Sequence, residues 1–343
     1  MKIPNKIFTV HIDVFYGLEF FQQSLHNIRN QTYSDLEIII SNNGALPEIQ
    51  DFIREQAQID SRIKVINYQQ NIFDFKDPEL KTYIICNDAL DVAKGEFFYY
   101  QSYDDLMSLD YIEKMVKLFN EDEKCMSAAG LPISIYEDNR VGEEELLNRT
   151  TNLRPRMIDG VELALDTIHG GNFFSAPGTI FSFRTNFLRE KGGFHRSVEF
   201  SQLYGMVPFG KTGFDETAIF YWRRGDHQLN KILTNNGYAG VNELYDLLED
   251  FDIFNRWLEF GQINAINVIN YCKRTVCHDA AQKFLINLAE LRFKAVIENL
   301  KIVSFKLYFW QSIPKVFWTA KKYFIFTLYK SIKKIILFRG ENK

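Results

Sequence analysis

Four apolar segments alternate with helical segments across residues 7–122, and this alternation limits the fold more than any other feature. The apolar segments are short and rich in β-branched residues, as buried strands are; they cover 7–14, 36–44, 63–68 and 96–103. Apolar residues at helical spacing lie between and after them, at 18–32, 47–58, 81–93 and 109–122. Such alternation predicts an α/β fold whose mostly parallel sheet carries helices on both faces.

The pattern changes after residue 130, where we expect further strands, a helix near 158–168 and glycine-rich loops. Residues 241–300 show helical spacing throughout, and we expect Lys94 and Gly95 to cap the helix of residues 81–93 at its C-terminus. We divide the chain into three parts. Residues 1–240 form a first domain with halves 1–120 and 121–240, residues 241–298 form a helical extension, and residues 299–343 form a tail.

Charge is distributed unevenly in this 343-residue chain of net charge −4. Residues 299–343 contain ten Lys or Arg and one Glu, which gives +9 and leaves −13 for residues 1–298. The N-terminal residues lack the apolar run of a signal peptide. Four cysteines without a dense framework fit a reducing cytoplasm; Cys272, Cys277 and His278 have no zinc-type spacing, so helix packing is favoured over a metal cluster.

Adjacent carboxylates at Asp104 and Asp105 stand where an apolar strand ends and a helix is about to begin. Ligands of α/β sheets bind at the carboxyl ends of strands, and carboxylate oxygens suit a hard divalent cation. The alternative is structural, because either Asp could instead cap the following helix. The residues alone do not choose between these two interpretations.

Three blocks of the chain resemble the family 2 glycosyltransferases, in the family's order. They are the opening strand and turn TVHIDVFYGLEFFQQSL, the second strand NQTYSDLEIIISNNGA, and the block ICNDALDVAKGEFFYYQSYDDLMSLDYIEKMV. The resemblance implies a GT-A, Rossmann-like fold. It also implies transfer of a sugar from a nucleotide-diphosphate sugar with the help of a divalent metal, Mn²⁺ or Mg²⁺.

Site residues carried over from this resemblance lie at the strand ends. Phe15 falls where an aromatic residue stacks on the base, and Asn42 replaces the usual Asp that accepts a hydrogen bond from the base. Ser102 falls on the first carboxylate of the family's DXD motif and Asp104 on the second, which implies that Asp104 holds the metal with Asp105 beside it. Val14 and Tyr103 join the expected nucleotide-sugar site.

The second half also resembles the family, through HGGNFFSAPGTIFSFRTNFLREKGGF on the acceptor side and DETAIFYWRRGDHQLN near the donor. Arg223 and Arg224 are candidates to contact the donor diphosphate, and His227 is a candidate metal ligand; each could instead have only a surface role. The catalytic base is less defined, because Phe200 stands where the family has its Asp. Glu199 is the first candidate, and Asp215 and Glu216 are the alternatives.

The segment 301–340 carries no Asp or Glu and alternates basic with aromatic and aliphatic residues. This pattern favours an amphipathic helix on an anionic membrane surface, broken at Pro314, over packing on the enzyme or a dimer contact. The acidic body argues against nucleic acid as a partner. We therefore expect a cytoplasmic protein, peripheral on the inner face of the cytoplasmic membrane, with a glycan or lipid-linked acceptor.

These observations predict an inverting transferase of bacterial surface polysaccharide synthesis, such as capsule or O-antigen. The family's Gln-x-x-Arg-Trp signature of processive members is absent, which indicates addition of a single sugar. Two other functions stay open. A nucleotidyltransferase would normally have a glycine-rich phosphate loop near the N-terminus, and a catalytically degenerate binding or scaffold subunit would explain Asn42, Ser102 and Phe200.

Overall fold

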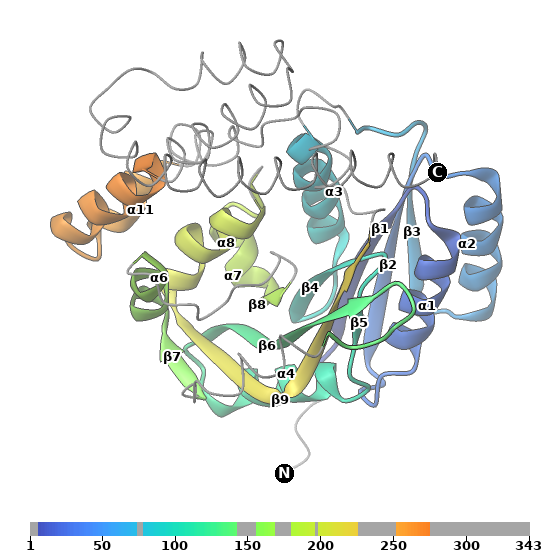
Figure 1. The fold of residues 1–343 in the computed structure, drawn as a ribbon, viewed down its shortest axis with the longest axis horizontal. Coiled ribbons are helices and arrows are strands. Elements are labelled where there is room, and N and C mark those ends of the chain that lie inside the picture. The colour runs from blue at the N-terminus through green and yellow to red at the C-terminus, as the bar shows by residue number, and fades with distance from the viewer. Residues whose placement is uncertain are drawn as a thin grey trace, which may run out of the picture.

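A computed structural model of the chain describes residues 6–73, 78–142, 156–168, 180–195, 198–225 and 252–274. These residues form one central sheet with the strand order β3-β2-β1-β4-β8-β6-β9-β5, and β7 pairs with β9 (Figure 1). The architecture is the expected α/β fold.

The first half of the sheet is parallel, as the sequence predicts. The strands are β1 (Phe8–Val14), β2 (Leu36–Asn43), β3 (Ile63–Tyr68) and β4 (Phe97–Ser102). The four predicted helices alternate with these strands along the chain. They are α1 (Leu18–Arg29), α2 (Pro47–Ile59), α3 (Pro78–Val92) and α4 (Tyr111–Glu121). All three pairings among these strands are parallel, so their carboxyl ends lie at one edge.

The second half of the sheet is mixed. It contains β5 (Leu106–Met107), β6 (Cys125–Tyr136), β7 (Met157–Asp159), β8 (Ser182–Arg184) and β9 (Lys211–Arg224). Strand β8 joins the halves by pairing antiparallel with both β4 and β6, whereas β6 and β9 are parallel. The mostly parallel sheet predicted from the sequence is therefore confirmed, and its antiparallel pairings all involve the short strands β5, β7 and β8.

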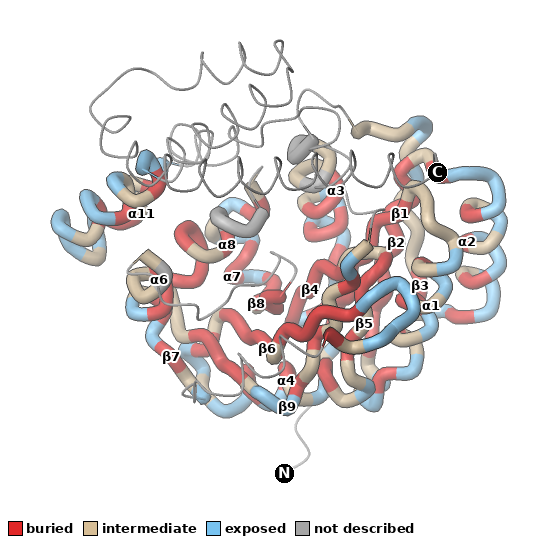
Figure 2. Tube along the Cα trace, viewed as in Figure 1, coloured by how far each residue is buried: buried red, intermediate tan, exposed pale blue. Residues whose placement is uncertain are grey.

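Helices cover both faces of the sheet. Side chains of α1, α2 and α4 pack on one face around Phe8, Val10 and Ile12 of β1. On the other face α3, α7 (Thr185–Glu190) and the 3₁₀ helix Val207–Phe209 pack around Phe98 and Phe183. Figure 2 shows the sheet strands as mainly buried, with exposed residues on the outer helix faces. Alternate side chains of each strand thus enter two separate cores.

A third, smaller core joins α6 (Gly160–Ile168), α8 (Val198–Gly205) and α11 (Ile253–Leu258). The fully buried Trp257 donates its indole hydrogen to the Tyr204 carbonyl at 2.7 Å. Residues 262–274 form a further helix, and Cys272 is buried in the same core as a free thiol. The helical extension predicted for 241–298 is described only at 252–274, and Cys277, His278 and the tail 299–343 lie outside the described residues. No helix within the described ranges is long and apolar enough to cross a bilayer.

The expected C-cap at Lys94 and Gly95 is wrong. Helix α3 ends at Val92, and Gly95 does not adopt a left-handed conformation. Instead, a Cβ at position 95 would lie 2.4 Å from the Thr9 hydroxyl oxygen and 2.7 Å from the Thr9 nitrogen. Gly95 is therefore needed for the close approach of the chain to β1.

Candidate active site

The carboxyl ends of β1, β2 and β4 bring three loops of the predicted site together. Val14 pairs with Asn42 on one side, and Asp13 pairs with Ser102 on the other. Parallel pairing therefore places the first and second family-like blocks beside the Asp104 turn, although they are far apart in sequence.

The Asp104–Asp105 turn does not cap a helix. Residues 103–105 lead into the short strand β5, and α4 begins only at Tyr111, with Asp110 at its N-cap position. The structural alternative offered by the sequence is therefore wrong for both acids. Their side chains have other partners.

The two neighbouring acids lie in different surroundings. Asp104 is 7% exposed, and its Oδ1 accepts a hydrogen bond of 2.5 Å from the Ser102 hydroxyl. Asp105 is 2% exposed, and its Oδ1 accepts a 2.9 Å hydrogen bond from the Arg223 backbone nitrogen. Burial and the charge of Asp104 raise the pKa of Asp105 well above its ordinary value, which favours its neutral form.

A buried ion pair, missed by sequence reasoning, lies beside this turn. The Lys81 Nζ lies 2.6 Å from Asp13 Oδ2, and the Tyr100 hydroxyl donates to Asp13 Oδ1 at 2.7 Å. Burial alone would raise the pKa of Asp13, but Lys81 and Tyr100 outweigh it and hold that pKa below the ordinary value. Tyr100 also experiences the charge of Asp104, so one neighbourhood contains both carboxylates.

The sequence did carry a signal for this pair. Asp13 is the only Asp, Glu, Lys or Arg of the buried strand β1, and Lys81 lies one helical turn before Ile85 on the buried face of α3. A charge on an apolar face requires a partner, because an unpaired buried charge is costly. Two such charges in neighbouring elements predict each other.

His11 lies beneath the ion pair, with 0% exposure. Its Nε2 is 3.0 Å from the Ser41 hydroxyl oxygen, and its ring centroid lies 5.3 Å from that of Tyr100. Burial lowers the pKa of His11 to about 4, although Asp13 opposes this effect. The imidazole is therefore neutral at neutral pH and adds no charge to the site.

Asn42 lies at the end of β2 within an amide network. Its Oδ1 accepts a hydrogen bond from the Ala45 nitrogen at 3.0 Å, and its Nδ2 donates to Asn67 Oδ1 at 2.9 Å. The intervening Gly44 has φ +62°, and a Cβ there would lie 2.4 Å from the Asn71 nitrogen. Asn42 therefore fixes the β2–α2 turn as well as lying where the base is expected.

Three aromatic residues surround the β1–α1 turn. The Phe15 and Tyr16 rings meet edge to face at 6.0 Å, and Tyr16 lies 5.4 Å from the Tyr103 ring. Gly17, at φ +80°, allows this arrangement, since a Cβ there would lie 2.6 Å from Tyr103 Cε2. Phe15 and Tyr103, both predicted site residues, thus occupy adjacent turns.

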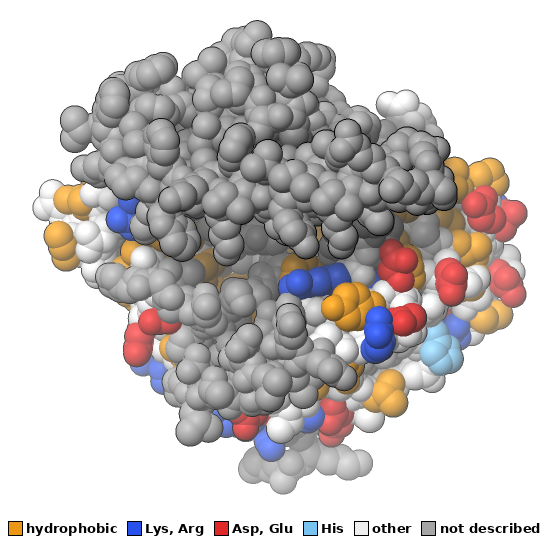
Figure 3. All heavy atoms as spheres, in the orientation of Figure 1, with side chains coloured by type: hydrophobic (Ala, Val, Ile, Leu, Met, Phe, Trp, Pro, Cys, Tyr) orange, Lys and Arg blue, Asp and Glu red, His pale blue; other side chains and the backbone are white. Residues whose placement is uncertain are grey.

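The two arginines predicted to contact the diphosphate differ strongly. Arg223 is fully buried, and its guanidinium donates to the carbonyl oxygen of Asp104 at 2.7 Å. Arg224 is exposed and stacks on the Trp222 ring at 4.6 Å. Basic, acidic and hydrophobic side chains lie close together over β5 and the end of β9 in Figure 3. Of the two arginines, Arg224 is the one with a surface position.

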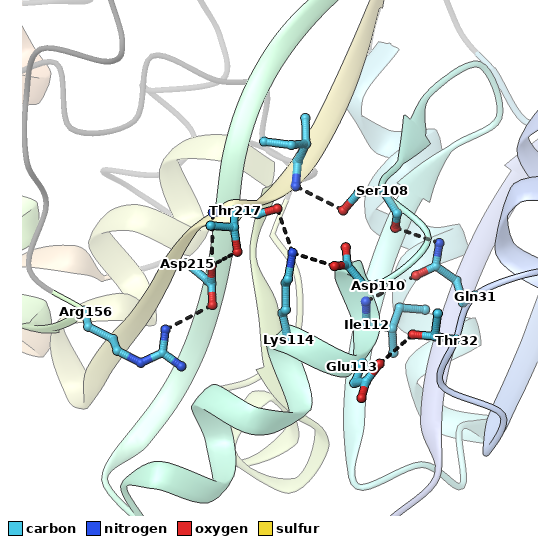
Figure 4. Close-up of polar contacts among 11 residues, drawn as sticks. Gln31, Thr32, Ser108, Asp110, Ile112, Glu113, Lys114, Arg156, Asp215 and Thr217 are labelled. Atoms are coloured by element: carbon cyan, nitrogen blue, oxygen red, sulfur yellow. Dashed lines mark hydrogen bonds and ion pairs between the residues drawn. The ribbon is translucent and has the colours of Figure 1, made fainter.

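Asp215 and Glu216 lie at a bulge of β9, where the register with β6 shifts. Asp215 accepts hydrogen bonds from Arg156 and Thr217, and Figure 4 shows it pointing toward both. Burial would raise the pKa of Asp215, but these two partners lower it overall. The bonds of Lys114 to the Thr217 carbonyl and Asp110 tie the same bulge to α4.

The bulge is distant from the Asp104 turn. Asp215 and Arg223 pair with Gly130 and Ile135 of β6, so at about 3.3 Å per residue they are separated by roughly 16 Å along the sheet. Arg223 contacts the turn, whereas Asp215 does not. The structure thus does not bring Asp215 or Glu216 together with the candidates at the Asp104 turn.

Two further candidates are described in part or not at all. Glu199 lies in the first turn of α8, and its side chain is outside the described residues, as is His227. Helix α8 contacts α3 directly. Asn87 of α3 also bonds both the nitrogen and the carbonyl of Phe194, which lies shortly before α8 in the sequence. Among the described residues, no three His, Cys, Asp or Glu side chains are grouped as a metal site.

Residues 9–176 match the Glycosyl transferase family 2 profile. The chain matches this family over just under half of its length, which confirms the predicted resemblance. It is 29% identical over 111 residues to the putative glycosyltransferase EpsH of Bacillus subtilis, covering 32% of this chain and 30% of that protein. It is 25% identical over 134 residues to an uncharacterized glycosyltransferase of Haemophilus influenzae, covering 39% of each. The matched part thus spans well under half the length of these relatives.

Two solved structures share the fold. The mannosyltransferase PcManGT of Pyrobaculum calidifontis, in complex with GDP-Man and Mn²⁺, has a TM-score of 0.52 and 12% identity, covering 93% of this chain and 88% of its own. S. aureus TarS 1–349, in complex with UDP-GlcNAc, has a TM-score of 0.50 and 10% identity, covering 87% and 90%. The predicted GT-A fold is confirmed.

Proposed function

We propose that this chain is an inverting family 2 glycosyltransferase that moves a single sugar from a nucleotide-diphosphate sugar to a glycan or lipid-linked glycan. The observation that carries the proposal is the placement of Asp104. Its carboxylate lies at the carboxyl end of β4, is hydrogen-bonded by Ser102 and caps no helix. The nucleotide sugars bound by the two structural neighbours support the donor class.

The residues present fit a divalent cation. Asp104 supplies a carboxylate oxygen and Ser102 a hydroxyl oxygen, and Mg²⁺ or Mn²⁺ sites often combine one or two protein oxygens with substrate phosphates and water. The cation would neutralise charge on the departing diphosphate. Asp105 is a weaker candidate, because it is buried and its Oδ1 accepts the Arg223 backbone hydrogen. His227 stays a proposed ligand from the family resemblance alone.

The donor contacts follow from the strand ends. Phe15 would stack on the base with Val14 beneath it, Asn42 would bond the base edge, and Tyr103 would border the ribose and diphosphate. Two basic side chains lie near the expected diphosphate. Lys81 is 17% exposed and is paired with Asp13, whereas Arg224 is exposed at the end of β9. Cations near a diphosphate stabilise its developing charge.

Glu199 is the base we propose for the acceptor hydroxyl. It lies in the first turn of α8, and this helix contacts α3, which also carries Lys81. Asp215 and Glu216 are left out of the proposal, because Asp215 is bound to Arg156 and both lie away from the Asp104 turn. Inversion requires a carboxylate on the acceptor side of the anomeric carbon.

The pathway and cellular location extend the proposal beyond the described residues. The match to EpsH and the basic aromatic segment 301–340 support a role in bacterial surface polysaccharide synthesis at the inner face of the cytoplasmic membrane. That segment would bind anionic lipid and bring the enzyme to lipid-linked acceptors.

A donor-hydrolysis screen tests the function directly. The full chain is incubated with UDP-, GDP-, dTDP- and CMP-sugars, with Mn²⁺ or with chelator, and release of the nucleotide is measured. We expect hydrolysis of one donor class that requires metal and falls by about 100-fold or more in Asp104→Ala, as expected when charge stabilisation at a leaving group is removed. Nucleotide binding without turnover of any donor would instead indicate the degenerate binding subunit.

A further inference from the structure

Arg223 connects four parts of the molecule around the Asp104 turn. Its Nε donates to the Asp104 carbonyl at 2.7 Å, its Nη1 to the carbonyls of Tyr136 and Glu137 at 3.2 and 3.1 Å, and its Nη2 to Gln23 Oε1 at 3.1 Å. The guanidinium also stacks on the Phe20 ring at 4.7 Å. The turn, the end of β6 and helix α1 are thus joined to β9 through one side chain.

The backbone of Arg223 adds a second connection to the same turn. Its nitrogen donates to Asp105 Oδ1 at 2.9 Å, next to the Nε bond to the Asp104 carbonyl. Asp104 is therefore fixed through its own carbonyl and through the side chain of the following residue. Its carboxylate is fixed locally by Ser102.

A guanidinium suits this task better than an ammonium. Its planar fork donates in several fixed directions at once, whereas Lys is a compact charge with rotatable donors. The four acceptors of Arg223 lie on three separate segments, and three of them are backbone carbonyls whose positions are set by the fold. Because Arg223 is fully buried, it does not offer these donors to a ligand at the surface.

We propose that Arg223 is a positioning residue, which holds the Asp104–Asp105 turn against β9 so that the Asp104 carboxylate is aimed at the donor's divalent cation. This inference rests on the proposed function for the identity of the cation site. It changes the role expected from sequence, because Arg223 acts through the turn and not on the diphosphate. It also gives Asp105 the role of acceptor for the Arg223 backbone hydrogen, and not of metal ligand.

The test measures Mn²⁺ binding to the full chain, from the electron paramagnetic resonance signal of free Mn²⁺ in the presence of UDP, GDP or dTDP. Wild type is expected to bind Mn²⁺ with one of these nucleotides, and Asp104→Asn to lose that binding. Arg223→Lys is expected to weaken it by about 10- to 100-fold, the usual effect of changing a residue that orients a metal ligand. In turnover assays, the same variant should need more Mn²⁺ but recover much of its kcat at saturating metal.

Arg184 provides a matched control elsewhere in the sheet. Its guanidinium also donates to backbone carbonyls, those of Cys125 and Phe119, and stacks on the Phe119 ring at 5.5 Å. Arg184→Lys should lower the melting temperature and leave Mn²⁺ affinity unchanged. Equal Mn²⁺ affinity in folded Arg223→Lys and wild type would overturn the inference while leaving the proposed function intact.

Asp105 gives a second test that does not alter the arginine. Asp105→Asn keeps an oxygen to accept the Arg223 backbone hydrogen and should bind Mn²⁺ within about threefold of wild type, whereas Asp105→Ala should weaken binding as Arg223→Lys does. If Asp105→Asn loses Mn²⁺ as fully as Asp104→Asn, Asp105 is a ligand and the inference is wrong. A wild-type chain that binds no Mn²⁺ with any of the three nucleotides overturns both the inference and the proposed metal site. Mn²⁺ binding without sugar transfer would contradict the proposed function alone.

Discussion

The acids at the carboxyl ends of β1 and β4 differ from the acids at the β9 bulge in burial and in their partners. Asp13 and Asp104 are 4% and 7% exposed and lie within one group of tyrosine, lysine and serine side chains. Asp215 instead belongs to a surface network with Arg156 and Glu121. Acidic residues that look equivalent in sequence therefore serve different purposes, and their position relative to the strand ends decides which.

Neutralising Glu199 of α8 and Asp215 of the bulge tests most strongly which candidate acid acts on the acceptor. Glu199→Gln should lower kcat for transfer to an acceptor by about 10²- to 10⁴-fold, because it removes the proposed general base. Asp215→Asn should change kcat by no more than about twofold, since it removes only a surface ion pair. Both constants are measured with the donor identified by the hydrolysis screen.

Donor binding in the absence of acceptor is the control for that experiment. Glu199→Gln should keep metal-dependent donor binding, as judged by calorimetry with the nucleoside diphosphate, because the base does not contact the diphosphate. A large loss of transfer in Asp215→Asn, with Glu199→Gln active, would show that Asp215 and not Glu199 acts as the base.

Removing the cation from each region should separate them by stability. Lys81→Met leaves Asp13 buried without its countercharge and should lower the free energy of unfolding by about 3–5 kcal/mol. Arg156→Met should lower it by about 1 kcal/mol or less, because Arg156 is 43% exposed and its ion pairs are screened by solvent. Urea unfolding at neutral pH measures both values.

Asp13→Asn combined with Lys81→Met serves as the control. The double variant should recover part of the stability lost in Lys81→Met, since no uncompensated buried charge is left. Equal losses in Lys81→Met and Arg156→Met would show that the Asp13–Lys81 pair is as weakly coupled as a surface pair.

The sequence predicted the first half of the fold well, because β1 to β4 are short segments rich in apolar residues and the helices α1 and α2 between them are amphipathic. Asp104 could also be predicted, since its block lies at a strand end. The sequence could not predict that Asp104 caps no helix, because the strand β5 that follows it has two residues and is too short to show a periodic pattern. The role of Arg223 depends on carbonyl groups distant in sequence, which no residue pattern encodes.

The third difference between the regions is their response to pH, and it centres on His11 beneath the ion pair. Burial holds the pKa of His11 at about 4, against 6.5 in the unfolded chain. The unfolded state therefore takes up a proton that the folded state does not as pH falls from 6.5 to 4. The contribution of the neutral imidazole to the free energy of unfolding is complete above pH 6.5. It decreases by about 3 kcal/mol in total as the pH falls from 6.5 to 4.

Comparing wild type with His11→Gln isolates most of this contribution, because the acids remote from His11 titrate alike in both proteins. The stability advantage of wild type over His11→Gln should shrink by about 3 kcal/mol between pH 7 and pH 4, measured by urea unfolding at each pH. Arg156→Met should show no such change relative to wild type over the upper part of this range, since its partner Asp215 has a pKa below the ordinary aspartate value. A constant difference between wild type and His11→Gln would mean that His11 titrates normally. The interior beside Asp13 would then be hydrated, and its burial would no longer distinguish it from the bulge of β9.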